Sequence, residues 1–137
     1  MSDNPFVGDW TYRSLLNDTD VNTDFDKLEF GRGTIVINES PLQLLVGTIG
    51  GPGWSLDLKG ARGYGNPMSV RFQGKGVIGG EEWIYDYEGW LVPPWPNGVQ
   101  QMPAMVGSIV RTIPHSGGQP GMVSPAGVVA SWYAVKV

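Results

Sequence analysis

Apolar and polar residues alternate with a period of two along the whole chain, and no window of about 11 residues gives a convincing helical period. The clearest alternation lies at residues 54–59, directly after the turn sequence Gly-Gly-Pro-Gly at residues 50–53. Strict alternation is typical of a strand that is buried on one face. The 21 glycines and 11 prolines among the 137 residues fall between such runs, where they indicate turns. The pattern therefore predicts many short strands.

Eight strands are expected from this alternation, at residues 8–14, 28–38, 42–49, 54–59, 69–75, 81–92, 105–113 and 127–137. Their connections are short, whereas parallel pairs need crossovers of about a dozen residues or more, so the strands should be antiparallel. Eight meandering strands can close into a barrel, which leaves no exposed edge, and a two-sheet sandwich is the main alternative. We predict an all-β chain that forms an antiparallel up-and-down barrel of about eight strands, with residues 1–137 as a single β-barrel domain.

Composition narrows the classes of partner. The net charge is −4 and the nine Lys and Arg residues are scattered, so the basic stripe that nucleic-acid binding needs is missing. The sequence has no run of about 18 apolar residues and no basic amphipathic stretch, so we expect no membrane partner. The absence of cysteine excludes disulfides, thiolate nucleophiles and cysteine-based zinc sites. We expect no cofactor, and we expect a cytoplasmic protein because residues 1–5 lack the plan of a signal peptide.

The two ends of the chain carry a resemblance. The first strand opens with Gly8-Asp9-Trp10, and the last contains Ala-Ser-Trp-Tyr-Ala-Val-Lys at residues 130–136. The first motif resembles the opening of the calycins, which include lipocalins, fatty-acid-binding proteins and avidins, and the closing run resembles the last strand of an avidin. The resemblance implies a calycin-like barrel. It also makes Arg111 a candidate for the arginine of a late strand that commonly covers this tryptophan in lipocalins.

The strand expected at residues 81–92 carries the strongest signal for a binding site. Alternation places Trp83, Tyr85 and Tyr87 on one face, and the opposite face carries Ile84, Asp86, Glu88 and Trp90. Three aromatic rings, two with hydroxyls, suit a pocket that stacks a flat ligand and hydrogen-bonds its polar edge. The alternatives are that these rings fill the barrel or form a subunit contact.

Arg111 is the best candidate for an inward cation, because it shares a face of its strand with Gly107 and Ile109. A buried arginine can fix a carboxylate through bidentate hydrogen bonds. The predicted ligand-binding residues are Tyr12, Trp83, Tyr85, Tyr87 and Arg111. Together they favour a flat, partly apolar molecule that carries a carboxylate or carbonyl group. No catalytic residue can be assigned.

An acidic segment at residues 18–29 has oxygen-bearing side chains at the spacing of a calcium-binding EF-hand loop. Thr23 stands where such a loop needs glycine, and neither flank is helical in pattern. We therefore expect a solvated loop and predict no metal site. The only histidine, His115, is expected at the surface, and a site of several histidines is excluded by count.

The expected function is binding of a small apolar or aromatic molecule in the barrel interior. The first alternative is a barrel enzyme that catalyses a cyclisation, isomerisation or lyase step in the same cavity. The second is an interaction module in which Trp95 and its proline-rich loop contact a protein or glycan. Ile84, Trp90 and Trp132 are expected on the outer surface, and this apolar surface predicts a homo-oligomer, most simply a homodimer.

Overall fold

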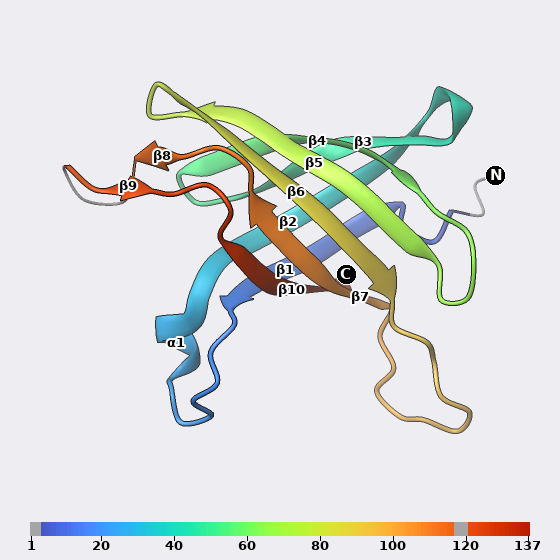
Figure 1. The fold of residues 1–137 in the computed structure, drawn as a ribbon. Helices are drawn as coiled ribbons and strands as arrows, with labels where there is room; N and C mark the ends of the chain where they lie inside the picture. Colours follow the sequence, from blue (N-terminus) through green and yellow to red (C-terminus); the bar gives the residue numbers. More distant parts are fainter. Residues whose placement is uncertain (1–3, 117–120) are drawn as a thin grey trace.

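The computed structural model describes residues 4–116 and 121–137. Eight strands form a closed antiparallel barrel (Figure 1). In order around the barrel they are β1 (Gly8–Leu16), β10 (Val129–Lys136), β7 (Ala104–Arg111), β6 (Glu81–Leu91), β5 (Ser69–Ile78), β4 (Trp54–Arg62), β3 (Leu44–Gly51) and β2 (Glu29–Ser40). The remaining elements are β8 (His115–Ser116), β9 (Val123–Ser124), the helix α1 (Phe25–Leu28) and the 3₁₀ turn η1 (Pro41–Gln43).

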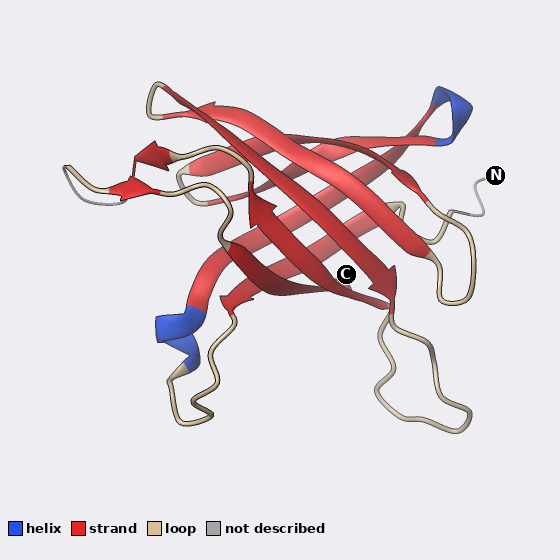
Figure 2. Cartoon of the chain, in the orientation of Figure 1, coloured by secondary structure: helices blue, strands red, loops and turns tan. Residues whose placement is uncertain are grey.

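The barrel closes through the pairing of β1 with β10, in which Tyr12 lies opposite Ala134. This pairing confirms the predicted barrel and excludes the two-sheet sandwich, and each of the eight expected strands is present. Strands dominate the described chain, and helix is confined to short connections (Figure 2). Glycine is required at position 33, where β2 lies close to the end of β3, because a Cβ atom there would collide with the carbonyl oxygen of Gly50. The proline-rich segment between β6 and β7 forms a loop without strands.

The N-terminal segment closes one end of the barrel. Phe6 and Trp10 are both 0% exposed, and the Trp10 indole Nε1 donates a hydrogen bond to the Phe6 carbonyl oxygen at 3.0 Å. The Phe6 amide in turn donates to the Asn4 side-chain oxygen at 3.0 Å. We call this end of the barrel the closed end, and it lies on the right in Figure 1. It also carries η1, the β4–β5 and β6–β7 loops and the C-terminus.

The cation above Trp10 is Lys136, whose Nζ lies 5.5 Å from the Trp10 ring centroid. The role that the sequence resemblance implies for Arg111 is therefore wrong. Strand register explains the difference, because Trp10 pairs with Lys136 at the closed end, whereas Arg111 pairs with Tyr85 toward the other end.

The opposite end, which we call the open end, carries the β1–β2 segment with α1, the tight β3–β4 and β5–β6 turns, and the β8–β9 hairpin (left in Figure 1). No chain terminus covers this end among the residues that the structure describes. The closed end is therefore filled by the chain itself, and the open end is where the interior remains accessible.

Trp132 lies inside the barrel at 2% exposure, so its expected position on the outer surface is wrong. Its indole occupies space that Gly89 of β6 leaves free, because a Cβ atom at Gly89 would lie 2.6 Å from the indole. Trp132 pairs with Gly107 of β7, where a Cβ atom would collide with the carbonyl oxygen of Glu88. Trp90 is on the outer surface as expected, 40% exposed.

Candidate functional site

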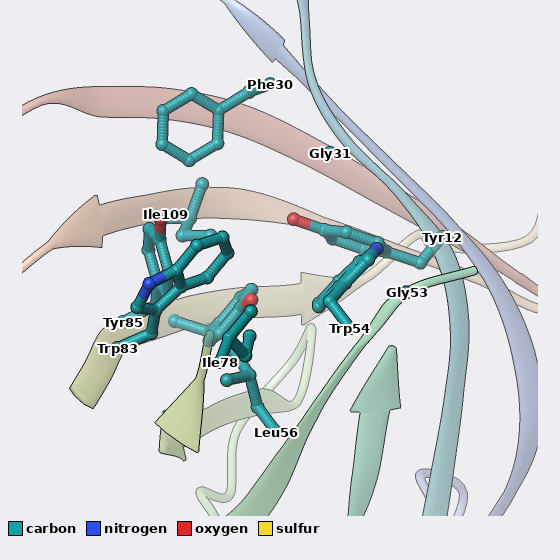
Figure 3. A pocket seen from close by; sticks show the side chains of 11 residues that line it. Tyr12, Phe30, Gly31, Gly53, Trp54, Leu56, Ile78, Trp83, Tyr85 and Ile109 are labelled. Carbon is teal, nitrogen blue, oxygen red and sulfur yellow. The ribbon is translucent and has the colours of Figure 1, made fainter. Parts of the chain in front are cut away.

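A cavity of about 320 Å³ opens at the open end of the barrel, and its walls are mainly apolar (Figure 3). Side chains from six of the barrel strands and the β3–β4 turn enclose it. The lining residues are Tyr12, Phe30, Gly31, Gly53, Trp54, Leu56, Ile78, Trp83, Tyr85, Tyr87 and Ile109.

Aromatic rings make up most of the wall. In Figure 3, Trp83 and Tyr85 lie on one side of the cavity, Tyr12 and Trp54 lie on the other, and Phe30 lies above. The inward face predicted for the strand at residues 81–92 is therefore confirmed. Alternation along β6 explains it, since Tyr85 is only 7% exposed while the next residue along the strand faces solvent.

Tyr85 is the centre of a polar cluster in the wall. Its hydroxyl lies 2.6 Å from His115 Nε2 and accepts a hydrogen bond from Arg111 Nε at 3.3 Å. The other ring nitrogen of His115, Nδ1, lies 2.9 Å from the Ser116 carbonyl oxygen. The cluster thus joins β6, β7 and β8, and it holds the Tyr85 hydroxyl in a fixed position.

His115 is 6% exposed, so its expected surface position is wrong. Its imidazole stacks on the Trp83 indole at a centroid distance of 3.9 Å and an interplanar angle of 14°. A carboxylate oxygen of Glu81 accepts a hydrogen bond from the Ser116 amide at 3.2 Å and ties β8 to the start of β6. No periodic pattern surrounds His115, so the sequence carries no signal for this contact.

Arg111 contacts the cluster but does not line the cavity. Its guanidinium lies 4.9 Å from the Phe30 ring centroid and donates a hydrogen bond from Nη1 to the Pro125 carbonyl oxygen at 3.2 Å. These contacts hold the cation behind the aromatic wall. It touches the lining of the cavity through the Tyr85 hydroxyl and the Phe30 ring.

A second polar cluster lies deeper in the barrel. The Tyr12 hydroxyl donates a hydrogen bond to Ser14 Oγ at 2.8 Å and is hydrogen-bonded to Tyr87. Burial raises the pKa of Tyr12 to about 12, and burial together with the nearby Tyr12 raises the pKa of Tyr87 well above its ordinary value. Both hydroxyls are therefore neutral at physiological pH and act only through hydrogen bonds.

Four of the five predicted ligand-binding residues line the cavity, namely Tyr12, Trp83, Tyr85 and Tyr87. Their role in binding stays a prediction. The sequence reasoning missed Phe30, Trp54, Leu56, Ile78 and Ile109 as lining residues. For Trp54 and Leu56 a signal exists, because they form the apolar face of the clearest alternating strand.

The acidic segment before β2 uses its side chains for its own turns. Asp18 Oδ1 accepts a hydrogen bond from the Asp20 amide at 2.9 Å, and Asp20 Oδ1 accepts one from the Asn22 amide at 2.9 Å. Within residues 4–116 and 121–137, no group of three or more His, Cys, Asp or Glu side chains could hold a metal ion. In the same residues, no helix has the length and apolar character needed to span a bilayer.

Comparison of the chain with known protein families, with curated proteins and with solved structures returned no match.

Proposed function

We propose that the protein binds a small apolar or aromatic molecule in the cavity at the open end of the barrel. The observation that carries this proposal is the combination of an aromatic wall with one fixed hydroxyl, that of Tyr85. Ligand pockets in proteins have this composition: mostly apolar walls with a few polar groups that orient the ligand. An interior cavity behind a Gly-x-Trp first strand also supports our assignment of the chain to the calycin-like barrels.

The size and shape of the cavity favour a compact, flat ligand. A volume of about 320 Å³ lies at the small end of the range for ligand pockets, which is roughly 300–1,000 Å³. Trp54 and Trp83 form opposite sides of the cavity (Figure 3), so a planar ring system can contact aromatic carbon on both sides. One or two fused rings fit this arrangement.

We expect the polar edge of the ligand to contact Tyr85. The expectation of a carboxylate-bearing ligand rested on a free inward arginine, whereas the guanidinium of Arg111 is engaged by Pro125, Tyr85 and Phe30 behind the wall. Tyr85 is the member of the cluster that lines the cavity directly. We therefore place the ligand's polar group against the Tyr85 hydroxyl.

A screen of flat one- and two-ring compounds by tryptophan fluorescence tests the proposal. Binding should change the emission of Trp54 and Trp83, and the change should shrink in Trp54→Phe. Trp95→Phe is the matched control, because Trp95 is exposed in the β6–β7 loop at the closed end. A response that is lost in Trp95→Phe and kept in Trp54→Phe would contradict the proposal, and so would a screen in which no compound binds.

A second candidate function is an isomerisation, cyclisation or lyase reaction in the same cavity. The observation in its favour is the Tyr85–His115 hydrogen bond of 2.6 Å with Arg111 beside it, since a tyrosine paired with a histidine can move a proton to or from a bound molecule. Mass spectrometry of a molecule that co-purifies with the protein, followed by incubation with excess of it, separates the two candidates. Turnover that Tyr85→Phe abolishes while binding persists would favour the enzyme.

A further inference from the structure

The direction of the hydrogen bonds around Tyr85 is set by a backbone carbonyl. The Ser116 carbonyl oxygen can only accept, so His115 Nδ1, 2.9 Å away, carries the proton. In a neutral imidazole the other nitrogen then has only a lone pair. The Tyr85 hydroxyl, 2.6 Å from Nε2, must therefore donate its proton to His115.

Arg111 takes a further hydrogen-bonding position of the same hydroxyl. A guanidinium has donors and no acceptor, so Arg111 Nε donates to the Tyr85 oxygen at 3.3 Å. The hydroxyl has then given away its only proton and accepted one hydrogen bond. It retains a lone pair and has no proton for a molecule in the cavity.

The hydrogen bonds of the deeper cluster also direct a tyrosine proton toward the protein. Tyr12 donates to Ser14 Oγ, which lies 3.5 Å from the carbonyl oxygen of Gly31, again a group that can only accept. Tyr12 is also hydrogen-bonded to Tyr87. The hydroxyl proton of Tyr12 is thus directed at the protein and not at the cavity.

We infer that the Tyr85 hydroxyl recognises a hydrogen-bond donor, so that the ligand carries an N–H or O–H group on its flat ring where it meets Tyr85. This inference rests on the proposed binding function and names the chemical class of the ligand. It replaces the carboxylate or carbonyl that the sequence favoured at this position.

Three probes of nearly equal size and shape test this selectivity by isothermal titration calorimetry at about pH 8, where histidine is ordinarily neutral. Indole offers an N–H donor, benzofuran has an ether oxygen at the same place, and 1-indanone carries a carbonyl acceptor. We expect indole to bind the wild-type protein about fivefold more tightly than either of the others, the scale of one neutral hydrogen bond.

Two variants then change the direction of the hydrogen bond. In Tyr85→Phe the acceptor is lost, so the three probes should bind within about twofold of one another. In His115→Phe the ring that stacks on Trp83 is kept, but the Tyr85 proton loses its acceptor and becomes available to the cavity. That variant should bind 1-indanone about fivefold more tightly than the wild type does. Tyr64→Phe, in the exposed β4–β5 loop at the closed end, is the control and should match the wild type.

The outcomes separate the inference from the function on which it rests. Equal affinities for the three probes in the wild type, or tighter binding of 1-indanone, would overturn the inference and leave the cavity a binding site. An indole preference that survives in Tyr85→Phe would also overturn it. Failure of all three probes to bind the folded wild-type protein would overturn the proposed function itself. Thermal melts identify a variant that does not fold, and the other variant then decides.

Discussion

The two ends of the barrel are built from the same eight strands but differ in what fills them. At the closed end, Phe6, Trp10 and Met105 are fully buried, and the N-terminal turn hydrogen-bonds to the Trp10 indole. At the open end the side chains leave a cavity, and the hydroxyl of Tyr85 in its wall is hydrogen-bonded to His115 and Arg111. The comparison indicates that packing for stability is concentrated at one end, which leaves the other free to bind a ligand.

The largest effect that we expect comes from truncating a tryptophan at each end. Trp10→Ala should lower the free energy of unfolding by about 3–5 kcal/mol, because it removes a fully buried ring at the closed end. Trp83→Ala, at the half-buried wall of the cavity, should cost about 1–2 kcal/mol. Urea denaturation of both variants measures the difference. Equal losses would contradict the division between a packed end and a binding end.

An intermediate effect should appear at alkaline pH. Between about pH 10 and pH 12 the unfolded chain releases the Tyr12 proton, whereas the folded protein retains it because the pKa of Tyr12 is raised to about 12. The unfolded state is therefore favoured as the pH rises. The free energy of unfolding should fall by roughly 2–3 kcal/mol over this range, and the raised pKa of Tyr87 adds to the loss.

Denaturant unfolding at a series of pH values checks this behaviour. Tyr12→Phe should give a shallower decline above pH 10, because one of the buried hydroxyls no longer titrates. Tyr64→Phe removes an exposed tyrosine in the β4–β5 loop and should leave the decline unchanged. A decline of the same slope in all three proteins would place the alkaline sensitivity outside the barrel interior.

We expect the smallest effect on stability from a substitution on the outer surface of the barrel, midway between its two ends. Trp90, Val106 and Tyr133 lie side by side across β6, β7 and β10 in an exposed apolar row. Homodimer formation stays a prediction, now centred on this row. Trp90→Glu should change the unfolding free energy of the monomer by about 0.5 kcal/mol or less, yet convert a dimer to a monomer in sedimentation. A wild-type protein that sediments as a monomer at high concentration would refute the dimer.

Alternation was enough to predict the eight strands and the inward face of β6. A period of two is a local property, and turns at Gly50–Gly53 and Gly79–Gly80 divide the strands without ambiguity. Trp132 was assigned to the wrong face because a shift of one residue exchanges the two faces of a strand. Gly89, which leaves room for its indole, lies two strands away in the barrel and is unremarkable in the sequence.

Arg111 and His115 show which part of the candidate site the sequence could not predict. Alternation gives the face of a residue, but the height of Arg111 along the barrel depends on the register between β7 and β6. His115 reaches Tyr85, 30 residues earlier, through a hairpin that packs against the end of the barrel. Neither fact follows from local patterns. The aromatic wall on β6 could therefore be predicted from the sequence, whereas the hydrogen-bonding cluster behind it could not.

The closing pair of strands also governs when the barrel can close. Thr11 pairs with Val135, so the first of the barrel strands to be synthesised hydrogen-bonds to the last of them. Until β10 is synthesised, β1 and β7 each keep an unpaired edge, and contacts across such long stretches of chain form slowly. During translation the sheet therefore has two edges that can pair with other strands, and β10 removes both when it closes the barrel.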